Sequence, residues 1–300
     1  MRVAPYYEKL LQAGLKAGES MEPIIYSGMF DSGVDYLFTL FAPLAAAELT
    51  TNTLINTVDL SGLTTKEEIV EELSFSFRNP QTDNGGKPDY QTLTQHVLEL
   101  GQKQPVLLIV YLGQDGKTDP GLFRFLNRLR NLLGWKFSYT LFLTSRLLLN
   151  STYQSPLIDK VIKRNLLRVL PLNNTNARIV LANYEERYKK KLSSDIQRLV
   201  LSLSGGNPGL IKSLYLQAKE DSAWKKPDFL EESLSFRLAE IWADIPKEGQ
   251  TEKVPKNLEN ILSYYGYLIK KGTHTHMFTP TIMEFARQYG TVPIHQANNS

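Results

Sequence analysis

The stretch that decides the fold reads PIIYSGMFDSGVD and spans residues 23–35. Its apolar start predicts a short strand that ends at Gly28, and a turn from Gly28 to Gly33 then leads into an apolar helix. The order strand, glycine, four residues, glycine, helix is the context of a phosphate-binding loop, in which the glycines let backbone N–H groups surround phosphates. The sequence therefore predicts the frame of such a loop here.

The two side chains that such a loop needs next are missing. Val34 stands where a lysine would reach the β- and γ-phosphates, and Asp35 stands where a hydroxyl would bind magnesium. Losing the lysine removes a charge-assisted contact of about 1.5–3 kcal/mol. Asp35, together with Asp31 inside the loop, adds negative charge where a triphosphate would lie. We therefore expect weak or absent ATP binding.

Strand and helix patterns alternate through the first half of the chain. Further strands are expected at residues 54–60, 105–112, 137–144 and 166–170, and helices at 6–17, from 64 onwards, at 90–104 and from 121 to 133. The run 105–112 has almost no polar interruption, which is typical of a strand buried on both faces of a parallel sheet. The alternation predicts an open α/β sheet with helices on both faces. The apolar segment from Tyr36 to Ala47 is expected to be a buried helix.

The pattern changes after residue 172. Helices are expected at residues 175–190, 193–202 and 208–220, and around 229–243. A charged linker then leads to a helix at 258–265, two short strands at 267–269 and 277–278, and a last helix at 280–289. Helix, β-hairpin and helix is the outline of a winged-helix unit. We therefore predict an α/β domain at 1–172, a helical lid at 173–245 and a winged-helix-like domain at 246–300.

Four features in this order resemble the AAA+/STAND superclass of P-loop ATPases, the branch that also contains archaeal origin-recognition initiators. They are the glycine loop 28–33, the buried strand 106–112, the strand end Phe142-Leu143-Thr144-Ser145-Arg146, and Leu170-Pro171-Leu172 followed by a lid with Ser204-Gly205-Gly206-Asn207-Pro208-Gly209. The resemblance covers roughly residues 20–220, and a final winged helix belongs to the same pattern. It implies a P-loop NTPase fold and a nucleotide site in which Thr144, Ser145, Arg146 and Pro208 would be neighbours of the nucleotide.

The departures from this pattern predict a pseudo-ATPase. Tyr111 and Leu112 occupy the strand-end positions of the magnesium-binding and water-activating carboxylates, and Asp115 follows a few residues late. We therefore predict no catalytic and no metal-binding residue, and no bound cofactor beyond residual ATP or ADP. The vestigial nucleotide site would comprise Gly28, Gly33, Val34, Asp35, Arg146 and Pro208. The four expected neighbours of the nucleotide also have structural interpretations: Thr144 and Ser145 can cap the next turn, Arg146 can form a structural ion pair, and Pro208 can restart a helix after Asn207.

Composition excludes several other kinds of protein. The 300 residues contain no cysteine, which excludes disulfides, thiolate zinc sites and a cysteine nucleophile, and only four histidines. Net charge is +3, an excess that is compatible with nucleic-acid contact without demanding it. The chain opens without a signal-peptide pattern, and its most apolar stretch contains Pro43 and is too short to cross a bilayer. We therefore expect a soluble, cytoplasmic protein without membrane contact.

Three functions remain open at this point. The first is a protein-interaction or assembly module that docks onto a partner such as an active paralogue, to which Arg124, Arg128 or Arg130 could be offered in trans. The second is a DNA-binding initiator or regulator that uses Lys270 and Lys271 at the tip of the wing, although the helix before the wing is poor in basic residues. The third is a weak ATPase that uses non-standard residues such as Asp115.

Overall fold

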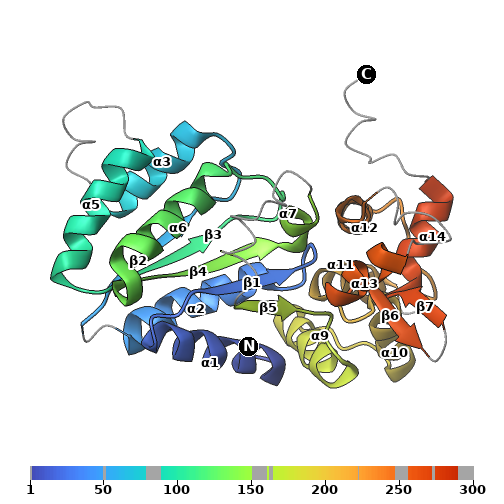
Figure 1. Ribbon diagram of the computed structural model, residues 1–300. Helices are drawn as coiled ribbons and strands as arrows, with labels where there is room; N and C mark the ends of the chain where they lie inside the picture. Colours follow the sequence, from blue (N-terminus) through green and yellow to red (C-terminus); the bar gives the residue numbers. More distant parts are fainter. Residues whose placement is uncertain are drawn as a thin grey trace. The chain divides into compact units, whose positions relative to one another are not determined.

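A computed structural model describes residues 2–49, 52–78, 89–150, 161, 165–221, 223–246, 256–271 and 274–289 (Figure 1). The chain divides into two compact units. Residues 9–27 and 34–168 form one of them, here called the sheet unit. Residues 1–8, 28–33 and 169–300 form the other, here called the lid unit, so the glycine loop groups with the later helices. The predicted domain limits at residues 172 and 245 remain predictions.

The central sheet has five parallel strands in the order β2-β3-β4-β1-β5. The strands are β1 (Ile24–Gly28), β2 (Leu54–Asp59), β3 (Val106–Tyr111), β4 (Phe137–Thr144) and β5 (Leu166–Val169). Val106 of β3 lies in register with Leu54 on one side and with Phe137 on the other. Every residue of β4 is buried, as expected for a strand covered on both faces. The predicted α/β sheet is therefore confirmed.

Helices cover both faces of the sheet (Figure 1). On one face lie α3 (Lys66–Ser76), α5 (Tyr90–Lys103) and α6 (Gly121–Leu133), whose apolar side chains join Val58, Leu108 and Leu141 in a single core. On the other face lie α1 (Pro5–Glu19) and α2 (Val34–Glu48). There Tyr26 stacks on Phe142 with 4.6 Å between the ring centroids.

Helix α2 corrects one expectation. Its buried residues, Val34, Leu37, Phe41 and Ala45, form a single stripe at helical spacing, and Pro43 on the opposite side is exposed. The segment is therefore not buried all round, because it covers the sheet with one side only. Alanine and leucine on the outer side gave the run an apolar composition without requiring burial. The sequence also gave no sign of the short helix α7 (Ser145–Leu149) after β4.

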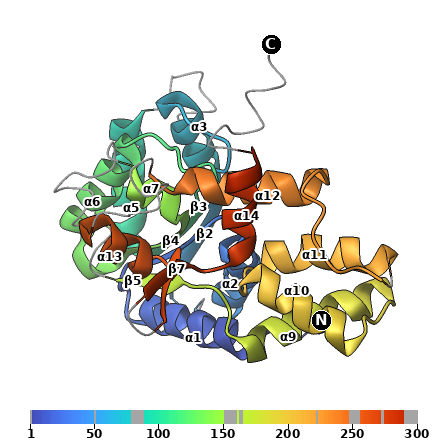
Figure 2. The ribbon, with the colours of Figure 1, turned by 90° about the vertical axis from the view of Figure 1, so that its right-hand side faces the viewer.

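Between residues 174 and 244, the regular elements that the structure describes in the lid unit are helices. They are α9 (Asn174–Tyr188), α10 (Ser194–Ser204), α11 (Pro208–Glu220) and α12 (Glu232–Asp244), and Figure 2 shows α9, α10 and α11 side by side. After them come α13 (Lys256–Tyr264), β6 (Leu268–Lys271), β7 (His274–Met277) and α14 (Pro280–Tyr289). Strands β6 and β7 pair antiparallel. The expected order of helix, hairpin and helix is present, and its assignment as a winged helix remains a prediction.

The contact between α1 and the sheet generates a stability prediction. Gly14 faces the fully buried Tyr26, and a Cβ on Gly14 would lie only 2.0 Å from the hydroxyl oxygen of Tyr26. That hydroxyl donates a hydrogen bond to the carbonyl oxygen of Leu10 (2.7 Å), so it is held in place. Glycine to alanine inside a helix normally stabilises by about 1 kcal/mol. Here we expect Gly14→Ala to lower the free energy of unfolding by about 1–3 kcal/mol in urea titrations, because the core is overpacked.

Gly18→Ala is the matched control on the same helix. A Cβ there would lie 2.6 Å from Cδ1 of Leu49, which is the tip of a flexible side chain that can move away. We expect a neutral or slightly stabilising effect from this substitution. Equal destabilisation by the two substitutions would contradict the role given to Tyr26.

Candidate functional site

The glycine loop 28–33 is shaped by its own packing. Gly33 has φ +97°, which favours glycine, and a Cβ there would lie 2.4 Å from the hydroxyl oxygen of Tyr7. Tyr7 is buried, and its hydroxyl donates to the carbonyl oxygen of Ser32 (2.9 Å). A Cβ on Gly28 would lie 2.7 Å from the carbonyl oxygen of Val169. Gly33 is therefore required by its backbone conformation and both glycines by close packing, without reference to a ligand.

A carboxylate of the chain itself binds an amide of this loop. The N–H of Phe30 donates to Oδ2 of Asp244 (3.1 Å), and the hydroxyl of Tyr267 donates to the same oxygen (2.7 Å). Asp244 is the last residue of α12 and is only 2% exposed. In nucleotide-binding loops such amides bind phosphate oxygens. Here an aspartate 214 residues further along the chain supplies the negative oxygen at Phe30.

Asp244 was missed by sequence reasoning. Its partner Phe30 is remote in the chain, so no local pattern links the two residues. One signal was available: an acidic residue at the C-terminal end of a helix is unfavourable, because the helix dipole is negative there. An aspartate in that position suggests a compensating partner, although it does not identify Phe30.

The start of α11 meets the other side of the loop. The side-chain amide of Asn207 donates to the carbonyl oxygen of Phe30 (3.0 Å), while its Oδ1 accepts from the N–H of Leu210 (3.0 Å) and caps the helix. The N–H of Gly209 donates to the carbonyl oxygen of Asp31 (3.2 Å). Pro208 is the first residue of α11, which confirms its interpretation as a helix restart. The structure thus brings Gly28, Gly33 and Pro208 into one region of the lid unit.

Asp31 forms an ion pair with Arg237 of α12. Its Oδ2 lies 2.7 Å from Nε of Arg237, and the two side chains are 18% and 17% exposed. The Nε–H bond of Arg237 does not point at this oxygen, so the contact is an ion pair and not a hydrogen bond. We expected Asp31 to add negative charge to the loop, and the ion pair with Arg237 offsets that charge. Asp31 and Arg237 belong to no common sequence pattern, so this pair could not be predicted.

The candidate residues that follow the loop belong to the sheet unit. Val34 opens α2 and is buried, and Asp35 beside it is exposed. At the end of β3 the ring of Tyr111 stacks on that of Phe38 with 5.1 Å between centroids, and Leu112 is buried. These two strand-end positions are therefore occupied by packed hydrophobic side chains. Asp115 follows in a turn and is exposed.

The end of β4 has a structural role in the sheet unit. The hydroxyl of Thr144 accepts from the N–H of Arg146 (3.3 Å), so Thr144 caps α7, as the structural interpretation predicted. The aliphatic part of Arg146 lies against Gly116, where a Cβ would come within 2.5 Å of its Cγ. Arg146 therefore lies beside the turn that carries Asp115. Lys270 and Lys271, the candidate DNA contacts, lie on β6 in register with Thr275 and His274.

Comparisons with known proteins identify the fold. No family model matches the sequence, and neither does any curated protein. Among solved structures, a Walker-type ATPase of Pyrococcus abyssi has a TM-score of 0.55 at 12% identity, covering 93% of this chain and 95% of that one. The Orc1 protein of Aeropyrum pernix in complex with DNA has a TM-score of 0.54 at 12% identity, covering 98% of this chain and 95% of that one. Cdc6p of Pyrobaculum aerophilum has a TM-score of 0.54 at 14% identity, covering 96% of both.

These likenesses show the AAA+ P-loop ATPase fold, the fold of the archaeal origin-recognition initiators, over nearly the whole chain. At 12–14% identity they show the fold alone. Within the described ranges, no helix is long and apolar enough to span a bilayer. In the same ranges, no three side chains of the histidine, cysteine, aspartate or glutamate type are grouped as metal ligands.

The contact between Asp244 and the loop generates the second prediction. Asp244→Ala removes the acceptor of two buried donors, the N–H of Phe30 and the hydroxyl of Tyr267. An unsatisfied buried donor costs about 1–3 kcal/mol, so we expect a loss of about 2–5 kcal/mol in the free energy of unfolding, measured by urea titration. Asp244→Asn should cost less than half as much, because its amide oxygen can still accept. As a control, Asp195→Asn changes an exposed aspartate and should be neutral. A neutral Asp244→Ala variant would contradict the contact.

Proposed function

We propose that this chain is an AAA+-fold protein that does not hydrolyse ATP and acts as a protein-interaction or assembly module. The observation that carries the proposal is the hydrogen bond from the Phe30 N–H, inside the glycine loop, to the buried carboxylate of Asp244. A phosphate oxygen at this amide would have to displace that carboxylate and would face its negative charge. On this proposal the loop has a structural role, because it is hydrogen-bonded to Asp244 of α12 and Asn207 before α11 within the lid unit.

The remaining residues fit magnesium and a triphosphate poorly. Val34 has no charge with which to bind a phosphate, and Asp35 would repel one. Tyr111 and Leu112 provide no carboxylate for a metal ion or for activating water. Asp31 is already paired with Arg237. The loop, the helix that follows it and the end of β3 all lack the residues of an ATP-hydrolysing site. The proposal therefore does not depend on the alignment of any single position.

A protein partner is supported by exposed apolar side chains in the sheet unit. Leu132 and Trp135, at the end of α6 and in the following 3₁₀ turn, are 54% and 65% exposed. Burying such a side chain at an interface contributes about 1.5–3 kcal/mol. We propose a partner of the same fold that retains the loop lysine and the strand-end carboxylates. Arg130 is not a candidate for reaching that partner, because its guanidinium donates to the carbonyl oxygens of Met21 and Gly134 (2.9 Å each).

The central test is the binding of nucleotide to the purified protein. A ligand at 100 times its Kd stabilises a protein by about 2.7 kcal/mol, which raises the melting temperature of a chain of this size by several degrees. We expect no shift with Mg²⁺ and ATP at about 1 mM, which is about 100 times a Kd of about 10 μM. We also expect no release of phosphate above the rate in buffer alone. A clear shift accompanied by Mg²⁺-dependent turnover would contradict the proposal. Turnover that Asp115→Asn abolishes would favour the weak ATPase instead.

DNA binding is the second candidate function. It is favoured by the hairpin β6–β7 between two helices, with Lys270 and Lys271 on β6, and by the likeness to an Orc1 structure that contains DNA. Lysine–phosphate contacts release counterions, so affinity falls with salt at a slope of about −0.9 per contact. If the hairpin binds DNA, Lys270→Gln with Lys271→Gln should make the slope shallower by about 2 in filter binding across a salt series.

The matched control for this test is Lys225→Gln with Lys226→Gln, which removes the same charge from two neighbouring lysines that are exposed in the lid unit. This control should leave the slope unchanged if the hairpin is the contact surface. Absence of binding at low salt, or equal effects of the two pairs, removes the DNA hypothesis.

A further inference from the structure

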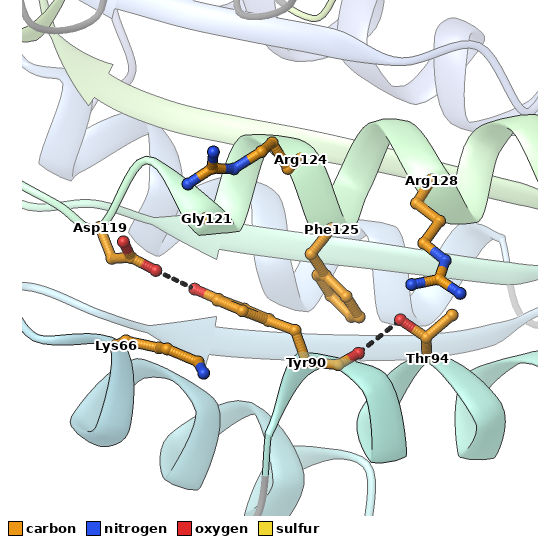
Figure 3. A pocket seen from close by; sticks show the side chains of 8 residues that line it. All are labelled: Lys66, Tyr90, Thr94, Asp119, Gly121, Arg124, Phe125 and Arg128. Carbon is orange, nitrogen blue, oxygen red and sulfur yellow. Dashed lines mark hydrogen bonds between the residues drawn. The ribbon is translucent and has the colours of Figure 1, made fainter.

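We propose that a cavity between α3, α5 and α6 binds the phosphate group of a small phosphate monoester. The cavity measures about 350 Å³, and all of its lining residues belong to the sheet unit (Figure 3). Its polar lining consists of Lys66 from α3, Tyr90 and Thr94 from α5, Asp119 before α6, and Arg124 and Arg128 from α6. None of these residues belongs to the glycine loop, so this proposal is independent of the proposed function.

The lining carries an excess of positive charge. Three cationic side chains, Lys66, Arg124 and Arg128, face one carboxylate, that of Asp119, which gives a net charge of +2. Asp119 accepts a hydrogen bond from the hydroxyl of Tyr90 (2.9 Å). Among the described residues none of the three cations forms a salt bridge, and the charge of Lys66 also acts on the nearby carboxylate of Asp89. A phosphate monoester carries a charge of about −1.5 to −2 at pH 7, so it matches this excess better than a single carboxylate does.

The two arginines line the cavity from the same helix. Arg124 and Arg128 are four residues apart on α6, so they project from the same side of the helix. Figure 3 shows Arg124 toward the Asp119 end of the cavity and Arg128 toward the Thr94 end. Like charges at this spacing destabilise a helix slightly, and a bound anion removes that repulsion. Arginine also binds phosphate oxygens through two parallel hydrogen bonds.

The N-terminus of α6 adds to the positive potential. This 13-residue helix has Pro120 at its N-cap and therefore no side-chain hydrogen bond to its first turn, unlike α3 and α5, which both have capping boxes. Its first residue, Gly121, lines the cavity. A Cβ at Gly121 would lie 2.4 Å from Asp119 Oδ2 and 2.7 Å from the ring of Tyr90, so glycine keeps the backbone close to the cavity. An anion is favoured at such a helix start.

An aromatic pair forms the apolar part of the cavity. The rings of Tyr90 and Phe125 lie 5.4 Å apart between centroids. Burial, with the neighbouring Asp119, raises the pKa of Tyr90 well above its usual value, so the phenol stays protonated and donates to Asp119. This wall favours a phosphate attached to an aromatic or other apolar group over free phosphate. We therefore expect phenyl phosphate to bind more tightly than inorganic phosphate.

Isothermal titration calorimetry at low ionic strength tests the proposal with inorganic phosphate and phenyl phosphate as probes. We expect the wild-type protein to bind both, with the phenyl ester bound several-fold more tightly. Arg124→Gln combined with Arg128→Gln should weaken both by about tenfold or more, because the net charge of the lining falls from +2 to zero. Asp119→Asn should strengthen both, since it raises the net charge of the lining while the amide oxygen can still accept from Tyr90.

Lys103→Gln is the matched control, because it removes one charge from the exposed far end of α5. Its affinities should stay within about twofold of the wild-type values. Failure of the wild-type protein to bind either probe overturns the proposal. So does a double arginine variant that keeps its fold, by circular dichroism, and retains its affinity, or an Asp119→Asn variant that binds more weakly. Equal affinity for the two probes removes the role of the aromatic pair.

Discussion

The packing of the lid unit depends on one buried backbone amide, the N–H of Phe30, which needs a hydrogen-bond acceptor. Phe30 lies in a turn between a strand and a helix, where its N–H has no neighbour in a ladder or a helix to which it could donate. Asp244 supplies the acceptor, and the hydroxyl of Tyr267 donates to the same carboxylate oxygen. A buried carboxylate without such donors would be far more costly. The two donors and the carboxylate therefore stabilise one another and join the loop, α12 and the segment before β6.

The strands could be predicted because parallel strands covered on both faces have nearly continuous apolar sequences, as in residues 105–112. The lid helices were predicted from their helical pattern, and the structure shows the caps that begin them: Asn173, Ser193 and Asn207 each accept a hydrogen bond from the first turn. The same reasoning misjudged α2, because an alanine-rich helix has the same composition whether it is covered on one side or on all sides.

The candidate site was only partly predictable, since its decisive contacts join residues about 200 positions apart. The sequence showed which side chains the loop lacks, Val34 in place of lysine and Asp35 in place of a hydroxyl. It could not show that Asp244 and Arg237 bind the loop, because long-range pairing leaves no periodic signal. The glycines were a separate difficulty. Gly33 serves the backbone and the packing of Tyr7, so its presence is uninformative about ligands.

Asn207 has a consequence for how this sequence can diverge. One side chain bonds both the loop and the first turn of α11, and Asp244 and Arg237 hold the same loop from α12. Restoring a lysine at position 34 alone would leave the Phe30 amide occupied, and removing Asp244 alone would leave that amide without an acceptor. Either first step loses stability or gains nothing. A substitution in or against the loop therefore acts on several contacts of the lid unit at once, so these positions cannot change independently of one another.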